Sequence, residues 1–293
     1  APYFNMDGDP TYDIKEPCAA VAKGLPLAVD EREKAYLEAA NARCPEFADA
    51  SKYIDAARKL AVAYPDDLDA QVLLAEALML PARWRWDTID GEPTPGMDEA
   101  ERTLEALLRR DATHPGANHY YIHAVESSPT PERAVASAQR LMGLVPEAGH
   151  VVHMPGHIWL VLGDYNMTVT VNERAAELDS FRIANIKIQR VGGFRNALAM
   201  YNRCRELGLS IWIGTMPELG IGCAQGAAMS ALEGCDYPTD VEASLRWFQD
   251  DLMDPFIEVR DGRIELPATP GLGYTINESK LQRYLVARQV IAQ

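Results

Sequence analysis

The chemistry of this chain is concentrated in its histidines, because all six lie between residues 114 and 157. Imidazole is the side chain that binds divalent transition metals most readily at neutral pH. Two predicted helical segments carry the candidate ligands: His119, His123 and Glu126 at i, i+4 and i+7, and His150, His153 and His157 at i, i+3 and i+7. We therefore predict a site for zinc, iron, copper or nickel, with the two triplets facing each other across a groove.

A plainer interpretation of these histidines is that they are half-buried packing residues that cap neighbouring helices and bind no metal. Pro155 also affects the geometry, because a helix that begins only there leaves His150 and His153 in the turn before it. His114 lies in the preceding loop, where it would be a neighbour of the site rather than a ligand. The sequence leaves both alternatives open.

A second candidate site lies on a strand-like run over residues 183–189. Alternation along a strand places Asn185, Lys187 and Gln189 on one face. Lys187 would then stand near the C-terminal end of its strand, where barrel enzymes hold their catalytic groups. A buried lysine near other cations can act as a base because its pKa is lowered. The alternative is an ordinary solvated lysine at a strand end.

Helices must position the histidines, since apolar residues recur at helical spacing between residues 31 and 178. The expected helices cover residues 31–42, 48–64, 68–80, 97–110, 117–126, 131–144, 150–162 and 165–178. Prolines in the loops between them suit helix starts and breaks. Residues 1–30 contain prolines and glycines that favour an irregular lead-in.

The helical part has the spacing of stacked hairpins. The segments that begin at Thr113 and Val145 each end one helix and open another, about one tetratricopeptide repeat apart. Residues 114–126 and 149–157 resemble a family of bacterial tetratricopeptide-repeat proteins, over roughly residues 48–179. This resemblance implies an α-helical tetratricopeptide-like repeat domain that carries the histidines, and it implies no particular activity.

Beyond residue 180 the pattern changes to strands alternating with helices. Strands are expected over residues 183–189 and 209–214, helices over 196–207 and 221–232, and a hairpin over 256–266. This alternation predicts βαβ units with parallel strands, hence a partial α/β (TIM-type) barrel segment. The predicted domains are an irregular lead-in, 1–30, a helical-hairpin repeat domain, 31–180, and a partial barrel, 181–293.

Residues 185–193, 212–222 and 267–273 resemble the C-terminal part of the enolase superfamily. The most similar branch is the muconate-lactonising group, with o-succinylbenzoate synthases and N-succinylamino-acid racemases, over about residues 181–285. The resemblance implies that Lys187 exchanges a proton at the carbon next to a carboxylate. It also implies that Glu218 lies at the edge of the active site.

The chain departs from that family in its first 180 residues, which carry a helical pattern. The family's three magnesium-binding carboxylates and its second lysine, in a Lys-x-Lys strand, are missing. Magnesium is therefore expected only if another chain completes the site. A barrel segment with only a few strands exposes unpaired strand edges, which predict a homo-oligomer or a partner chain.

Three functions follow from these patterns. The first is a binding or scaffold protein in which helical repeats with a metal site are fused to a partial barrel. The second is an enolase-type racemase, cycloisomerase or synthase that acts on a small carboxylate and is completed by another chain. The third is a metal-dependent hydrolase or oxidase that uses the histidine site. The sequence leaves open whether the chain is an enzyme.

Composition excludes other classes. A formal charge of −15 and a pI near 4.8 repel phosphate backbones, so nucleic acid is not an expected partner. The apolar runs 72–80 and 151–162 are too short or interrupted to span a bilayer. Five scattered cysteines without a CxxC pair favour reduced thiols in the cytoplasm. Export is the alternative, in which Cys18 and Cys44 would be bridged.

Overall fold

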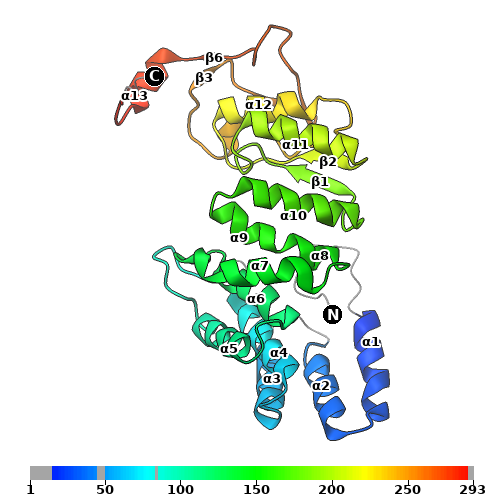
Figure 1. Cartoon of the computed structure of the whole chain (residues 1–293). Helices are drawn as coiled ribbons and strands as arrows, with labels where there is room; N and C mark the ends of the chain where they lie inside the picture. Colours follow the sequence, from blue (N-terminus) through cyan, green and yellow to red (C-terminus); the bar gives the residue numbers. More distant parts are fainter. Residues whose placement is uncertain (1–14, 45–49, 83–84, 290–293) are drawn as a thin grey trace. The chain divides into compact units, whose positions relative to one another are not determined.

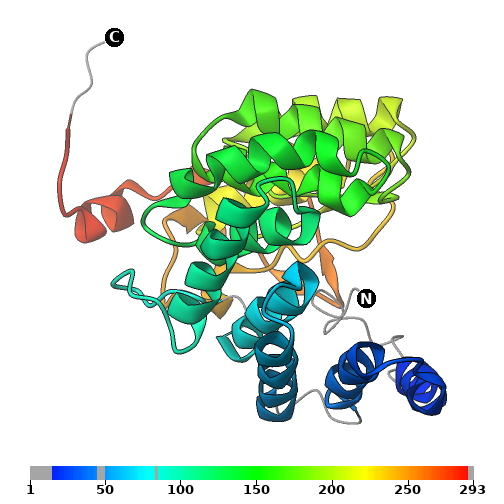
Figure 2. The ribbon, with the colours of Figure 1, turned by 60° about the horizontal axis from the view of Figure 1, so that its bottom comes forward.

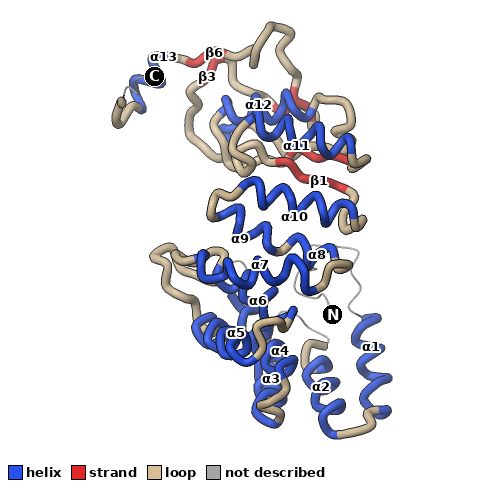
Figure 3. The backbone as a smooth tube through the Cα atoms, viewed as in Figure 1, coloured by secondary structure: helices blue, strands red, loops and turns tan. Residues whose placement is uncertain are grey.

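The computed structural model describes residues 15–44, 50–82 and 85–289 of the chain. These residues are mostly helical, with a few short strands (Figures 1 and 3). The chain divides into two compact units, Ala1–Leu178 and Asp179–Gln293. We call them the helical unit and the C-terminal unit. No described helix is long and apolar enough to cross a membrane.

The helical unit is built from helices that pack against their neighbours in sequence (Figures 1 and 2). They are α1 (Lys15–Gly24), α2 (Glu31–Asn41), α3 (Ser51–Ala63), α4 (Leu68–Met79), α5 (Met97–Arg110), α6 (Pro115–Val125), α7 (Val135–Leu144), α8 (Gly149–His153), α9 (Pro155–Val161) and α10 (Tyr165–Glu177). Short 3-10 turns lie at Leu25–Leu27, Leu80–Ala82 and Pro131–Ala134. The predicted helical content is confirmed, while the assignment to tetratricopeptide repeats stays a prediction.

Side-chain caps begin several of these helices. Asp30, Asp67 and Asp164 each accept a hydrogen bond from the backbone N–H three residues later, which satisfies one of the donors that a helix start leaves unpaired. Small residues allow close packing in the core, since Ala70, Ala75 and other alanines of α4 are fully buried. The aspartate caps and the small alanines are features of the sequence itself, and they favour the starts and the close packing of these helices.

Two details of the helical prediction are wrong. Residues 15–24 of the expected irregular lead-in form α1, because Pro17 lies in the first turn of a helix, where a missing N–H costs nothing. Residues 1–14 of that lead-in lie outside the described residues. The expected helix over 150–162 is divided by Pro155 into α8 and α9. His150 and His153 therefore lie on a different helix from His157.

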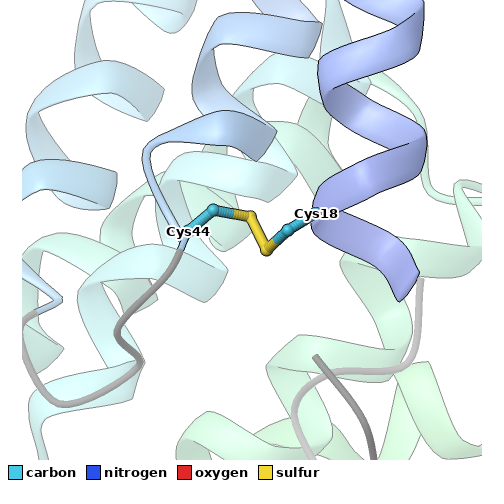
Figure 4. Close-up of a disulfide and its surroundings, with 2 residues drawn as sticks. All are labelled: Cys18 and Cys44. Carbon is cyan, nitrogen blue, oxygen red and sulfur yellow. A yellow bond between two sulfur atoms is a disulfide. The ribbon is translucent and has the colours of Figure 1, made fainter. Parts of the chain in front are cut away.

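A disulfide joins Cys18 of α1 to Cys44, three residues after the end of α2 (Figure 4). The Cα atoms of the pair are 5.8 Å apart. The expected reduced thiols are therefore found only at the other cysteines, Cys204, Cys223 and Cys235. The bridge ties α1 to α2, which are also in direct contact.

The C-terminal unit has one βαβ segment. Strand β1 (Ile183–Ile186) pairs in parallel with β2 (Ser210–Ile213), and α11 (Phe194–Glu206) connects them. The buried faces of both strands and α11 form one core with Met229 of α12 (Gly220–Ser230). The predicted parallel strands are confirmed, although β1 ends at Ile186 because residues 188–190 form a turn.

The rest of the C-terminal unit consists of short elements. Strand β3 (Met253–Asp254) pairs with β6 (Thr275–Ile276), and β4 (Val259–Arg260) pairs with β5 (Arg263–Ile264). The hairpin expected over residues 256–266 is confirmed, and its turn between β4 and β5 is Asp261-Gly262, both with positive φ, as a tight hairpin requires. A 3-10 turn, Ser244–Arg246, and helix α13 (Glu278–Tyr284) complete the unit.

The described residues of the C-terminal unit do not form a barrel. Their parallel sheet has two strands, β1 and β2, and each pairs with no other described strand. Closing a barrel takes about eight strands, with no open edge left. The expected partial barrel is thus a single βαβ segment followed by a second helix, α12.

Candidate functional site

Five of the six histidines lie together in the helical unit. Their ring centroids are separated by 5.0 Å for His119–His123, 5.1 Å for His119–His150, 5.4 Å for His123–His157 and 4.9 Å for His153–His157. Helices α6, α8 and α9 contribute these rings. The structure thus brings the two predicted triplets together, and we call the five residues the histidine cluster.

Glu126 holds two rings of the histidine cluster. It is the C-terminal capping residue of α6, and its Oε1 lies 3.1 Å from His123 Nδ1. Its Oε2 accepts a short hydrogen bond from His157 Nδ1. Burial by itself raises the pKa of this carboxyl, but the hydrogen bonds from His123 and His157 outweigh burial and lower the pKa to about 2. Glu126 is therefore a carboxylate at neutral pH, and both Nδ1 atoms must donate to it.

Asn172 of α10 holds a third ring. Its Oδ1 lies 2.8 Å from His153 Nδ1, and its Nδ2 donates to the Thr168 carbonyl at 2.7 Å. The second contact fixes the orientation of the amide, so its oxygen faces the ring and His153 Nδ1 is the donor. Gly156 of α9 allows this approach, because a Cβ at that position would lie 3.1 Å from Asn172 Nδ2.

The Nε2 atoms of the histidine cluster face one another in pairs. His153 Nε2 and His157 Nε2 are 3.0 Å apart, and His119 Nε2 and His150 Nε2 are 3.2 Å apart. Ligand atoms of His119, His123 and His150 all lie within 4.8 Å of one another, as do those of the triplet His123, Glu126 and His157. These distances suit donors that share a metal ion.

Burial favours the neutral form of His119, His150 and His153 in the histidine cluster. It lowers the pKa of His119 to about 2 and that of His150 to about 4, with a smaller effect from the positive charge of neighbouring rings. Burial also lowers the pKa of His153. Neutral imidazole is the form that coordinates a metal. His150 lies at the surface with its ring only partly shielded from solvent, and His123 is fully buried, so the cluster extends from the surface into the core.

His114 lies apart from the histidine cluster. Its Nδ1 accepts a hydrogen bond from the backbone N–H of Ala117 at 3.2 Å, and its Nε2 lies 3.2 Å from Asp69 Oδ1. It therefore caps the start of α6. His114 therefore contributes to local structure and to none of the ring contacts of the cluster. A substitution of His114 can serve as a control for substitutions in the cluster.

The second candidate site lies at the C-terminal ends of β1 and β2. Lys187 Nζ donates to the Thr215 carbonyl at 2.8 Å. Glu218 Oε1 accepts from the Met216 N–H at 3.1 Å and lies 3.4 Å from Thr215 Oγ1. Burial raises the pKa of Glu218, while its hydrogen bonds and the charge of Lys187 oppose the shift. Lys187 and Glu218 thus share one edge of the sheet, as expected for residues after parallel strands.

Gly214 makes room for this arrangement. A Cβ at Gly214 would overlap Asn185 Oδ1 and lie 3.0 Å from Lys187 Cε. Asn185 and Lys187 therefore pass over the end of β2 where it carries no side chain. Asn185 is exposed while Ala184 and Ile186 are buried, so the predicted alternation is confirmed for residues 183–186. Gln189, expected on the same face, lies in the turn 188–190 beyond the strand.

The described residues around Lys187 do not fit a magnesium site of the enolase kind. Groups of three or more close metal-ligating side chains in the described chain occur only in the histidine cluster. Glu218 is the candidate carboxylate beside Lys187, and its Oε1 already lies within hydrogen-bond distance of the Met216 N–H and the Thr215 hydroxyl. A magnesium ion would need carboxylates from elsewhere.

Sequence reasoning did not assign two residues that the structure places at these sites. Asn172 follows His153 by nineteen positions, and only the packing of α10 on α8 brings them together. Asp240 accepts a hydrogen bond from the Thr215 N–H at 2.7 Å and so fixes the loop after β2. No local sequence pattern around Asn172 or Asp240 predicts its hydrogen-bond partner.

Comparison with known proteins identifies the C-terminal part of the chain. Residues 152–280 match the family model described as enolase C-terminal domain-like. That part of the chain is similar to the enolase C-terminal domain. The match covers less than half of the chain and begins in α8, upstream of residue 181, where the resemblance seen in the sequence begins. The predicted enolase relationship is thus confirmed for the C-terminal part, whereas the tetratricopeptide relationship of the helical part stays a prediction.

Individual relatives agree with this family. The chain is 40% identical over 111 residues to o-succinylbenzoate synthase of Geobacillus kaustophilus, a match to 38% of this chain and 30% of that protein. It is 36% identical over 99 residues to N-succinylamino acid racemase of an Amycolatopsis species, covering 34% and 27%. The chain therefore spans about a third or less of these curated relatives.

Solved enolase-superfamily structures show a weak overall likeness. A member from Listeria innocua has a TM-score of 0.38 at 18% identity, covering 78% of this chain and 75% of that one. Muconate lactonizing enzyme of Klebsiella pneumoniae has a TM-score of 0.36 at 17% identity, covering 66% and 56%.

Proposed function

We propose that the C-terminal unit supplies the lysine side of an enolase-type active site, and that another chain completes the site. One observation carries the proposal. Lys187 and Glu218 lie together at the C-terminal ends of two adjacent parallel strands, within the residues that match the enolase family. This edge of a parallel sheet is where barrel enzymes hold their catalytic groups.

The proposed reaction is proton transfer at the carbon next to a carboxylate. Neutral Lys187 Nζ takes the proton, so that a C–H bond breaks, an N–H bond forms and the electron pair moves toward the substrate carboxylate. The Thr215 carbonyl, 2.8 Å from Nζ, orients the amine. Return of the proton from the same lysine gives exchange with solvent. Racemisation needs a second base on the opposite face, which the other chain would supply.

The substrate class follows from the relatives. The matched proteins are named as synthase and racemase of succinylated compounds, so we propose a small carboxylate substrate. Glu218 at the rim of the site is placed to accept a hydrogen bond from it. The raised pKa of Glu218 makes this carboxyl easier to protonate than an ordinary one, so it can also donate.

Completion by another chain has a structural argument of its own. Each described strand of the parallel sheet has one partner only, and an unpaired strand edge is a template for pairing with further strands. The family resemblance implies magnesium, and the carboxylates around Lys187 do not suffice to hold it. The completing chain, a second copy or a different protein, would bring both strands and metal ligands.

Fragment complementation tests the proposal. The full chain is mixed with the part of the Geobacillus kaustophilus synthase that precedes its matched segment, in D2O with magnesium. Deuterium uptake at the acidic carbon of an N-succinylamino acid is followed by NMR. We expect uptake only when both proteins are present, and a loss of at least 100-fold with Lys187→Ala, because a general base contributes about 10²–10⁴ in rate.

Lys280→Ala is the matched control, since Lys280 pairs with Asp250 on the surface and takes no part in the site. It should leave uptake unchanged. Uptake that survives Lys187→Ala would show that another residue is the base. A mixture that shows no uptake, although circular dichroism finds both proteins folded, would rule out the proposed half-site.

A second candidate function concerns the helical unit. Its specific support is the histidine cluster, which lies in the helical unit and would give a binding or scaffold protein its own ligand. A metal-dependent hydrolase or oxidase at that cluster would further need an open coordination position for substrate. Retained metal without hydrolytic or oxidative turnover would favour the binding role.

A further inference from the structure

The Nε2 atoms of His153 and His157 lie within hydrogen-bond distance, but neither carries a proton when both rings are neutral and each Nδ1 is the donor. Each ring uses Nδ1 as a donor, to the Asn172 amide oxygen in one case and to the Glu126 carboxylate in the other. A neutral imidazole carries one ring proton. The two Nε2 atoms therefore both present lone pairs, yet they are only 3.0 Å apart.

A shared cation resolves this contact. Two nitrogens that each lie about 2.0–2.1 Å from zinc, at a tetrahedral angle, are separated by about 3.3 Å. The His153–His157 separation of 3.0 Å and the His119–His150 separation of 3.2 Å are close to that value. Two ring nitrogens held this close, each with a lone pair, suit a metal ion shared between them.

We propose that the histidine cluster binds a divalent transition-metal ion through the facing Nε2 atoms of its pairs, His153 with His157 and His119 with His150. His123 lies between the two pairs, 5.0 Å from the ring of His119 and 5.4 Å from that of His157. An all-imidazole set selects zinc, copper, nickel or iron over calcium or magnesium, which prefer oxygen ligands.

Glu126 and Asn172 act in this site as positioning residues. Metal-binding histidines commonly donate their other ring N–H to a carboxylate or a carbonyl oxygen, which fixes the tautomer and the ring orientation. Glu126 does so for His123 and His157, and Asn172 does so for His153. An acceptor for three of five rings is a built site rather than a chance gathering of histidines.

The inference is independent of the enolase-type proposal, because it concerns the helical unit alone. The full chain is purified without an affinity tag of histidines, stripped with a chelator, reloaded with zinc and dialysed. Metal is then measured by mass spectrometry, and affinity by competition with a chromogenic chelator. We expect close to one zinc per chain, and a loss of at least ten-fold in affinity for His153→Ala and for His119→Ala.

Two further variants separate the site from general packing. His114→Ala removes the histidine outside the cluster and should retain metal as the parent does. Glu126→Gln keeps the size of the side chain and should lower the affinity for zinc by roughly 10–100-fold. This is the usual effect of losing a carboxylate that accepts the other ring N–H of a histidine ligand. This variant carries the test if an alanine variant loses its helical circular dichroism.

Two results would overturn the inference. One is a folded parent chain that retains no zinc, copper, nickel or iron above the level of a protein without the cluster. A proton shared between the two Nε2 atoms of each pair would then explain these short contacts. The other is zinc that binds equally well to the parent and to folded His153→Ala and His119→Ala, which would place it elsewhere.

Discussion

Asn172 and His153 are joined by a hydrogen bond of 2.8 Å that links α10 to α8. The amide oxygen of Asn172 is aimed at the ring because its Nδ2 is held by the Thr168 carbonyl. Gly156 of α9 leaves room for Asn172 where α9 approaches α10. One side chain therefore couples the packing of α10 to the orientation of a histidine in the cluster.

Asn172→Ala should destabilise the helical unit even without metal. It leaves the ring N–H of His153 without its acceptor, and an unsatisfied buried donor costs about 1–3 kcal/mol. Urea unfolding monitored by circular dichroism measures the change. Thr170→Ala is the control, because the Thr170 hydroxyl is exposed and bonds only to the Asn166 carbonyl. Equal effects of the two substitutions would contradict a special role for Asn172.

Gly214→Ala should destabilise the C-terminal unit by about 1–3 kcal/mol, the usual cost of overpacking. The added methyl overlaps Asn185 and presses on Lys187, so the end of β2 must shift. The matched control is Gly143→Ala in α7, where a methyl meets nothing within 4 Å. That control should be neutral or stabilising by up to about 1 kcal/mol. Unchanged urea midpoints for Gly214→Ala would show that the loop after β2 adapts.

The Cys18–Cys44 disulfide should be detectable by alkylation. Unfolded, unreduced chain should take up label at Cys204, Cys223 and Cys235, and reduction should add labels at Cys18 and Cys44. Intact mass reports the number of labels. Opening the bridge should lower the free energy of unfolding by about 3 kcal/mol, given a loop of 26 residues.

Five labels before reduction would show that the bridge does not form in the compartment where the protein was made. Such a bridge is typical of oxidising compartments, so protein isolated from its host would also test the expected cytoplasmic location.

Arg43→Met should be costly, because it leaves Glu76 as an uncompensated buried charge. The two side chains are 11% and 3% exposed and lie 3.2 Å apart, and Tyr53 donates to the same carboxylate at 2.6 Å. Breaking a buried pair costs about 3–5 kcal/mol. Arg102→Met, which removes an exposed pair with Asp98, should cost less than about 1 kcal/mol.

The deficit of Arg43→Met should depend on pH. Burial raises the pKa of Glu76, and Arg43 is the largest influence that lowers it. Without Arg43 the folded-state pKa rises further above the unfolded value. A raised pKa favours folding below the unfolded pKa, and this contribution is lost as pH rises through the folded pKa. The deficit should therefore be larger at pH 7 than at pH 4.5, and a constant deficit would contradict this account.

Local sequence patterns determined much of this protein. Apolar spacing and prolines in the loops predicted the helices, and alternation of apolar and polar residues from residue 183 onward predicted β1 and its face. Residue types and spacing also identified the histidines and Lys187 as the groups to examine. These properties depend on neighbours along the chain, so a sequence displays them.

Tertiary structure decided the rest. Pro155 divides the second histidine triplet between α8 and α9. Packing of these helices against α6 and α10 nevertheless brings the three rings into one cluster and places Asn172 beside His153. Cys18 and Cys44 meet because α1 forms and lies against α2. The strand edges of β1 and β2 stay open because the chain holds no further strand in register with them among its described residues. Contacts between distant residues depend on how helices and strands pack, and a local pattern does not carry that information.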